Sequence, residues 1–131
     1  MYVYPGLVTI AALVMYFAVT MNVGRARFKY GVKPPAMTGD PGFECAVRIQ
    51  QNTLEQMVFF LPLLWLFANY LNPLWAAILG GIWVLGRILY AIGYAQAPEK
   101  RAPGFAISSL SSLALLVGAS VGLIRSLLGL G

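Results

Sequence analysis

Apolar residues along the chain fall into four long stretches, separated by short polar segments. A helix needs about 20 mostly apolar residues to cross the hydrocarbon core of a bilayer. Four stretches meet that length, over residues 4–23, 41–70, 73–95 and 103–128. The pattern predicts an all-α fold, an integral membrane four-helix bundle that forms one domain over residues 1–131.

Two of the predicted helix starts carry a capping signal. Asp40-Pro41 and Asn72-Pro73 each place a side-chain acceptor directly before a proline. The acceptor can bind a free backbone N–H of the first turn, and proline suits the first helical position because its φ angle is already fixed. These dipeptides predict where the second and third helices begin.

The charges of the loops predict the orientation in the membrane. Segment 24–40 holds four basic residues and segment 96–102 holds two, whereas the turn around Asn72 holds none. Basic loops face the cytosol under the positive-inside rule. We therefore expect both basic loops in the cytosol and both termini outside. The compact loops favour a bacterial inner membrane over an endoplasmic reticulum.

The composition excludes several function classes. The chain is 60% hydrophobic and 10% charged, whereas soluble domains are about 45–50% apolar and about 25% charged. Its net charge of +5 lies in loops between apolar spans and not along one soluble face, which argues against nucleic acid as a partner. Histidine is absent and Cys45 is the only cysteine, so we expect no metal site and no His-based nucleophile.

The second helix carries polar residues inside its predicted span. Charged groups there cost about 2.5–3.5 kcal/mol each on insertion scales, so they need a partner or a function. Arg48, Asn52 and Glu55 are spaced i, i+4, i+7 and share one helix face. We expect this face to lie in the cytosolic half of the bilayer, where the second helix starts.

The third helix carries a matching polar face. Arg87, Tyr90 and Tyr94 are spaced i, i+3, i+7, and Arg101 follows in the next loop. One alternative is that these groups only pair with those of the second helix, for example Arg87 with Glu55. Three arginines outnumber the one deep carboxylate, however, and this surplus of positive charge favours an anionic ligand such as a carboxylate.

Three segments of the chain resemble a known family. The segment from Phe43 to Glu55, with the sequence FECAVRIQQNTLE, resembles the second-helix signature of the membrane-associated proteins in eicosanoid and glutathione metabolism. The segment RILYAIGY from Arg87 to Tyr94, followed by Arg101 and Pro103, resembles the third-helix signature. The loop from Pro34-Pro35 to Pro41 is also similar. The family includes the microsomal glutathione transferases, leukotriene C synthase and the five-lipoxygenase-activating protein.

The resemblance implies a homotrimer that binds glutathione between neighbouring subunits near the cytosolic face. Positions that match glutathione-binding residues of the family are Arg48, Asn52, Glu55, Tyr90 and Tyr94, with Arg27 and Gln50 at the periphery. Arg101 matches the arginine that stabilises the glutathione thiolate in catalytic members, so it is the expected catalytic residue. No metal cofactor is implied.

The chemistry of glutathione suits these residue types. Glutathione has two carboxylates, which Arg48 together with Arg87 or Arg27 could hold, and one ammonium, which Glu55 could hold. Its thiol has to lose a proton, and a free thiol has a pKa of about 8.5. A guanidinium beside the sulfur favours the thiolate, which can then attack a lipophilic electrophile or a lipid hydroperoxide that arrives through the bilayer.

The expected activity is a glutathione transferase, with glutathione-dependent peroxidase activity and a role in detoxification. Phe28 and Gln56 stand where, by alignment, the leukotriene synthase branch has a catalytic arginine and a tyrosine, so leukotriene synthesis is disfavoured. Two alternatives stay open. One is a non-catalytic lipid-binding scaffold of the same family, and the other is a small multidrug transporter, although the first helix lacks the carboxylate that such a transporter needs.

Overall fold

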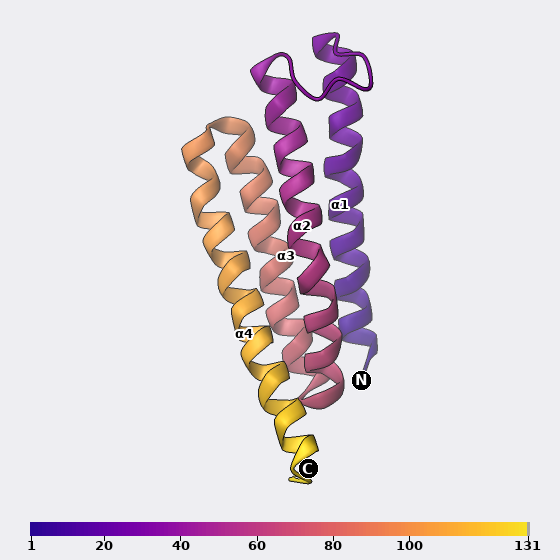
Figure 1. The fold of residues 1–131 in the computed structure, drawn as a ribbon, viewed down its shortest axis with the longest axis vertical. Coiled ribbons are helices and arrows are strands. Elements are labelled where there is room, and N and C mark those ends of the chain that lie inside the picture. The colour runs from indigo at the N-terminus through magenta and orange to yellow at the C-terminus, as the bar shows by residue number, and fades with distance from the viewer. Residues whose placement is uncertain (131) are drawn as a thin grey trace.

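The chain forms a bundle of antiparallel helices in a computed structural model that describes residues 1–130. The helices are α1 (Val3–Tyr30), α2 (Pro41–Tyr70), α3 (Pro73–Gln96) and α4 (Ala102–Leu127), and the short 3-10 helix η1 (Pro98–Arg101) precedes α4. They lie side by side along the long axis of the molecule (Figure 1). The all-α prediction is confirmed for the described part of the chain.

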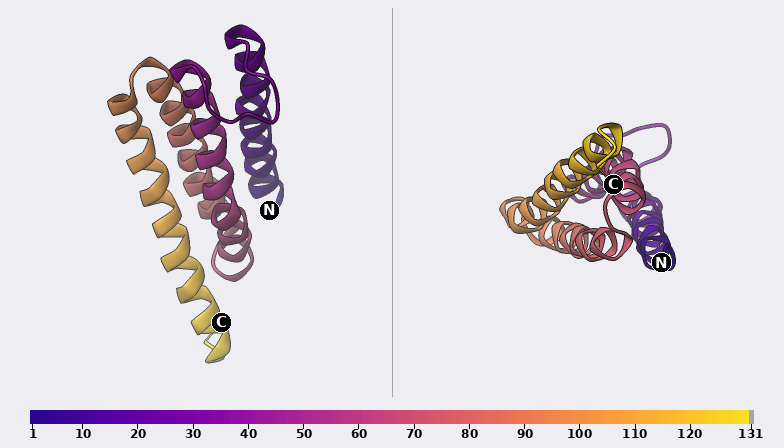
Figure 2. Two further views of the ribbon diagram at one scale, coloured as in Figure 1. Left: turned by 45° about the horizontal axis from the view of Figure 1, so that its top comes forward. Right: turned by 90° about the horizontal axis from the view of Figure 1, so that it is seen from below.

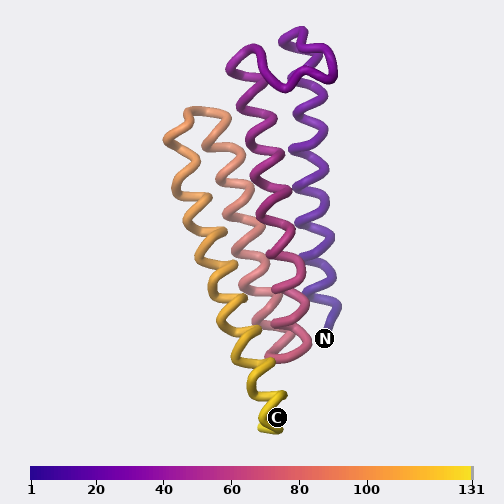
Figure 3. Tube along the Cα trace, viewed as in Figure 1, coloured from indigo at the N-terminus to yellow at the C-terminus, as the bar shows by residue number. Residues whose placement is uncertain are grey.

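The two basic connections lie at the same end of the bundle. The α1–α2 loop and the α3–α4 connection are together at one end, called here the loop end (Figures 1 and 3). The start of α1, the α2–α3 turn and the end of α4 lie at the other end. The charged segments that set the predicted orientation therefore share one side of the molecule.

Three helical segments of residues 1–130 are long and apolar enough to cross a membrane, namely α1, α3 and η1 together with α4. Helix α2 is not among them, and its first half carries Glu44, Arg48 and Glu55. The prediction of four spans is thus supported for three helices. The crossing of α2 stays a prediction, although α2 also connects the loop end to the opposite end.

The helix starts follow the predicted capping pattern. Asp40 Oδ1 accepts a hydrogen bond from the Gly42 backbone N–H at 2.8 Å, and Asn72 Oδ1 accepts one from the Trp75 N–H at 3.0 Å. Both predicted N-caps are confirmed.

Helix α1 is longer than the sequence pattern indicated. It was expected to end near residue 23 but continues to Tyr30, where Gly31 adopts a left-handed φ of 66° as the C-cap. Loss of apolarity marks the edge of the hydrocarbon core and not the end of a helix. Arg and Lys are good helix formers, and their charge is favourable at a helix C-terminus, so Arg27 and Lys29 extend the helix beyond the apolar stretch.

Helices α2 and α3 form the centre of the bundle. Helix α1 packs against α2 and α3, α4 packs against α2 and α3 as well, and within the described residues α1 and α4 do not contact one another. The view along the bundle places α1 and α4 at its two edges (Figure 2). The core holds Phe60 of α2 stacked on Trp83 of α3, with ring centroids 3.8 Å apart and both side chains fully buried.

Glycines allow α3 and α4 to approach closely near the loop end. A β-carbon at Gly104 would collide with the backbone nitrogen of Tyr90 and would lie 2.6 Å from the Gly86 carbonyl oxygen. Backbone atoms cannot rotate away as the end of a flexible side chain can. The absence of a side chain at Gly104 therefore sets the spacing of the two helices beside Tyr90.

This contact predicts that Gly104→Ala destabilises the bundle by about 1–3 kcal/mol, because overpacking forces the backbones apart. Gly81→Ala is the matched control in α3, since a β-carbon there has no atom within 4 Å, and it should be neutral or stabilising by about 0.5–1 kcal/mol. Unfolding of the purified proteins in detergent measures the change in the free energy of unfolding for both variants. Equal effects of the two substitutions would contradict the close packing of α3 and α4.

Candidate functional site

Arg87 connects the polar faces of α2 and α3. The side chain is fully buried, and its Nη2 donates hydrogen bonds to Asn52 Oδ1 at 2.6 Å and to Thr53 Oγ1 at 3.1 Å. The guanidinium also lies over the Tyr90 ring, with Cζ 4.1 Å from the ring centroid. Arg87 therefore holds Asn52 and Tyr90, two predicted binding residues, in fixed positions.

The partners of Arg87 are neutral oxygens and not the carboxylate of Glu55. Its Nε and Nη1 are buried and have no hydrogen-bond partner in the described part of the chain. The pairing of Arg87 with Glu55 that the sequence left open is therefore not the arrangement in the structure. Within residues 1–130 the positive charge of Arg87 has no hydrogen-bonded partner that would neutralise it.

An aromatic cluster extends from Arg87 toward the loop end. Tyr90 meets Tyr94 edge to face, with ring centroids 5.7 Å apart. The Tyr90 ring also lies near Phe105 of α4, with 6.2 Å between the ring centroids. The exposed guanidinium of Arg101 lies over the Tyr94 ring, 5.1 Å from its centroid. Arg101 Nη1 also donates to the Pro98 carbonyl oxygen at 2.8 Å, so the turn of η1 directs this side chain toward α3.

These residues line a polar pocket of about 760 Å³ between α2, α3, η1 and α4. Its lining residues include Asn52, Tyr90, Arg101 and Phe105, and the acidic Glu99 lies on it as well. The fold thus brings together three predicted site residues from three different elements. We call this cavity the polar pocket.

A second, smaller pocket of about 350 Å³ lies beside it and is lined by Glu44, Cys45, Arg48 and Tyr94. The Cys45 thiol donates to the Tyr94 carbonyl oxygen at 3.4 Å and so holds the start of α2 against the end of α3. Because Tyr94 lies between Arg48 in this pocket and Arg101 on the polar pocket, the two cavities adjoin at the loop end, and each is lined by one arginine and one glutamate. We call the smaller cavity the Arg48 pocket.

The remaining predicted residues lie elsewhere in the bundle. Glu55 is exposed and lines neither pocket. Arg27 donates to the Ala36 carbonyl oxygen at 2.7 Å, and Gln50 donates to the Tyr16 hydroxyl at 3.0 Å. Arg27 and Gln50 therefore make contacts within the α1 side of the bundle, away from the polar pocket.

Thr53 and Phe105 are members of the site that the sequence patterns did not identify. Thr53 is fully buried, donates its own hydroxyl proton to the Ile49 carbonyl oxygen at 2.8 Å, and accepts from Arg87. Its position directly after Asn52 in a polar run was the available signal. Phe105 gave no signal, because one aromatic residue in an apolar helix does not differ from a lipid-facing one.

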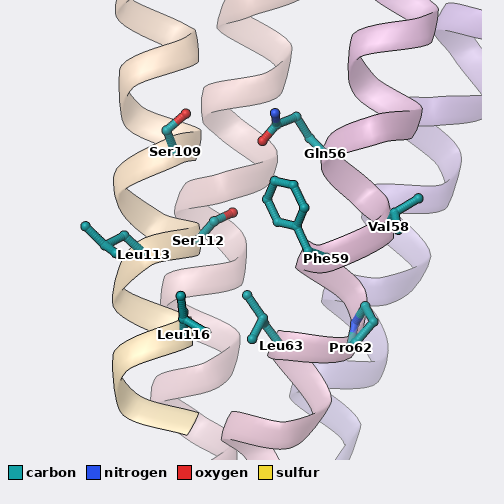
Figure 4. A pocket seen from close by; sticks show the side chains of 9 residues that line it. All are labelled: Gln56, Val58, Phe59, Pro62, Leu63, Ser109, Ser112, Leu113 and Leu116. Atoms are coloured by element: carbon teal, nitrogen blue, oxygen red, sulfur yellow. The ribbon is translucent and has the colours of Figure 1, made fainter. Parts of the chain in front are cut away.

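An apolar groove of about 610 Å³ follows the same α2–α4 seam deeper into the bundle (Figure 4). Gln56 and Phe59 of α2 lie opposite Ser112 and Leu116 of α4, with α3 behind them. Gln56 is four residues beyond Asn52, so the groove starts about one helical turn, roughly 5.4 Å, from the polar pocket. The site combines a pocket that carries charged residues with an apolar extension.

The sequence comparisons confirm the family that three segments of the chain resemble. The profile of the MAPEG family matches residues 5–121. The chain belongs to the MAPEG family, and it is an integral membrane protein.

Several relatives are similar over most of the chain. An uncharacterized protein of Synechocystis is 58% identical over 124 residues, which are 95% of this chain and 90% of that protein. Human microsomal glutathione S-transferase 2 is 48% identical over 101 residues, 77% of this chain and 67% of that protein. Bovine leukotriene C4 synthase is 34% identical over 123 residues, 92% of this chain and 81% of that protein.

The geometry around Arg87 predicts that Arg87→Lys destabilises the fold by about 1–3 kcal/mol. Lysine keeps the charge but lacks the planar fork, so it cannot reproduce the bonds to both Asn52 and Thr53, and a buried acceptor loses its donor. Arg125→Lys, at the exposed end of α4, is the control and should have little effect. Unfolding in detergent compares the two, and an unchanged Arg87→Lys protein would show that the fork is not needed.

Proposed function

We propose that the protein is a membrane-bound glutathione transferase that conjugates the glutathione thiolate to lipophilic electrophiles. The observation that carries the proposal is the position of Arg101, over Tyr94 and on the same pocket as Asn52 and Tyr90. Similarity to microsomal glutathione S-transferase 2 of human and cow, at 48% and 45% identity, supports it.

The recognition of glutathione uses its three charged groups. Arg48 binds a carboxylate from the smaller pocket, Asn52 binds the peptide backbone of glutathione from the polar pocket, and Tyr90 and Tyr94 supply hydroxyl groups between them. Arginine suits a carboxylate because its planar fork can donate two parallel hydrogen bonds. Arg87 is fully buried and lines neither pocket. It acts on glutathione indirectly, because its charge lies nearby and it holds Asn52 and Tyr90 in place.

The chemical step depends on a thiolate beside the Arg101 guanidinium. The Arg101 guanidinium stabilises the negative sulfur, and one unit of pKa corresponds to about 1.4 kcal/mol. The electrophile enters from the bilayer along the apolar groove, the thiolate forms a bond to its carbon, and the leaving group departs with the bonding pair. With a lipid hydroperoxide the same thiolate attacks the outer oxygen, the O–O bond breaks, and the lipid alkoxide leaves and takes a proton from water to become the alcohol. The resulting glutathione sulfenic acid condenses with a second glutathione to give the disulfide and water, which completes a peroxidase cycle.

The site is shared between subunits of a homotrimer in this proposal. Glu55 is exposed on α2, whereas Arg27 and Gln50 lie on the side of the subunit near α1. A neighbouring subunit that places its α1 side against the exposed face of α2 brings Arg27 and Gln50 to glutathione. Glu55 then has a place next to the ammonium of glutathione, facing the cytosol.

The first expected result concerns Arg101→Ala. Its rate of conjugation of glutathione to a small aromatic halide should fall about tenfold or more, because the thiolate loses its nearest cation, while glutathione affinity changes little. Lys100→Ala removes the neighbouring charge, which lines neither pocket, and should keep its rate. Steady-state kinetics and calorimetry measure the two quantities.

The outcomes separate the possibilities. An unchanged rate of Arg101→Ala would reject the role of Arg101 in thiolate stabilisation. Lack of glutathione binding by the unmodified protein would reject the transferase altogether and favour a non-catalytic lipid-binding member of the family.

The second expected result concerns the shared site. Arg27→Ala and Arg48→Ala should each impair glutathione binding when made alone. Coexpression of the two variants should restore about one quarter of the sites, because random mixing in a cyclic trimer leaves that share with both side chains intact. The two variants carry different tags, so mixed trimers can be purified through both tags and their transferase activity measured. Activity no higher than that of either variant alone would indicate that each subunit holds a complete site.

A further inference from the structure

A third cavity at the loop end takes no part in the proposed glutathione chemistry. It has a volume of about 330 Å³ and lies between the end of α1 and the start of α2, with Asn22, Arg25, Lys29 and Tyr30 among its lining residues. It shares no residue with the polar pocket. We call it the basic interface pocket.

The pocket is cationic and contains no acid. Arg25 and Lys29 are one helical turn apart on α1 and lie on the same face, and no aspartate or glutamate lines the cavity. The two acids at the start of α2 have other partners, because Asp40 accepts from the Gly42 N–H and Glu44 accepts from the Gly39 N–H. The two cations therefore face a space that lacks a counter-charge.

Other features of the pocket also favour an anion. Gly42 and Cys45 bring the first turns of α2 to its wall, and the N-terminal end of a helix carries a partial positive charge. The Tyr30 hydroxyl lies against Gly42, where a β-carbon would displace it. Tyr30 and Asn22 thus add hydrogen-bond donors beside the two charges.

The depth of the pocket in the membrane selects the kind of anion. The apolar stretch of α1 ends at Val23, so at 1.5 Å per residue Arg25 and Lys29 lie about 3 Å and about 9 Å beyond the hydrocarbon edge. The headgroup layer on each side of a bilayer is roughly 5–8 Å thick. Arg25 therefore lies within the headgroup layer, and Lys29 lies just beyond it, from where its long side chain can reach back to the lipid phosphates.

The surface below the pocket suits acyl chains. Val14 and Met21 are exposed and lie on the same face of α1 as Arg25, eleven and four residues before it. A water molecule occupies roughly 30 Å³ in the liquid, so the pocket has room for about ten, which fits a lipid headgroup and not a whole lipid. The acyl chains would then lie along Val14 and Met21 in the bilayer.

We propose that the basic interface pocket binds the phosphate headgroup of an anionic phospholipid in the leaflet at the loop end. Arg25 and Lys29 hold the phosphate, and Tyr30 and Asn22 hydrogen-bond to the headgroup. The pocket shares Gly42, Cys45 and Ala95 with the Arg48 pocket, but Arg25, Lys29, Tyr30 and Asn22 line neither glutathione pocket. Its lipid binding does not depend on transferase activity.

Native mass spectrometry of the purified protein in mixed micelles tests the proposal, with phosphatidylglycerol or phosphatidylcholine as the added lipid. The unmodified protein should retain phosphatidylglycerol in preference to phosphatidylcholine. The double variant Arg25→Gln/Lys29→Gln should bind phosphatidylglycerol with an affinity at least about tenfold lower. The double variant Lys33→Gln/Lys100→Gln loses the same charge from residues that do not line the pocket, and it should bind like the unmodified protein.

Three results would overturn the proposal. These are equal retention of the two lipids, an equal loss in both double variants, or release of phosphatidylglycerol by millimolar inorganic phosphate, which would indicate a site for free anions. The charge-preserving double variant Arg25→Lys/Lys29→Arg should keep the lipid. Its failure to do so while its unfolding temperature is unchanged would also contradict the proposed role of the two charges.

Discussion

The buried guanidinium of Arg87 is the contact on which the site depends. A cation without water around it needs close oxygen partners, and α2 provides two of them in Asn52 and Thr53. Because these partners are neutral, the fold keeps a net positive charge in the centre of the bundle. The same contact fixes the register between α2 and α3, so it decides which side chains of the two helices face one another toward the loop end.

Close packing of α3 and α4 completes the cavity. Gly104 lets the start of α4 lie directly against the backbone of α3 beside Tyr90, and η1 then brings Arg101 over Tyr94. A wider spacing would move Arg101 and Phe105 away from the aromatic cluster. The polar pocket is therefore a product of helix spacing as much as of the charged residues that line it.

The loop end combines three kinds of environment within a short distance. The polar pocket and the Arg48 pocket each offer an arginine and a glutamate to a soluble, charged ligand, and the groove along the α2–α4 seam offers an apolar surface. The basic interface pocket lies near the depth of lipid phosphates. A protein that joins a water-soluble thiol to a lipophilic molecule needs the first two side by side. Their arrangement along one seam, about one helical turn apart, meets that need.

The sequence alone determined the helices, their caps and the polar faces. Apolar length, the Asp40-Pro41 and Asn72-Pro73 signals and the spacing of Arg87, Tyr90 and Tyr94 are local properties, because helix periodicity converts spacing directly into a shared face. Family resemblance in the same segments added the candidate ligand. The end of α1 was misplaced because hydropathy reports on lipid contact, whereas the helix itself continues through basic residues.

Only the tertiary structure decided which of these faces meet. Arg87 bonds to Asn52 and Thr53 and not to Glu55, Phe105 joins the site from α4, and Arg27 and Gln50 lie on the α1 side of the bundle. Pairing across helices depends on the rotation and spacing of each helix relative to its neighbours. Those quantities follow from the packing of the whole bundle, so no spacing within a single segment of sequence encodes them.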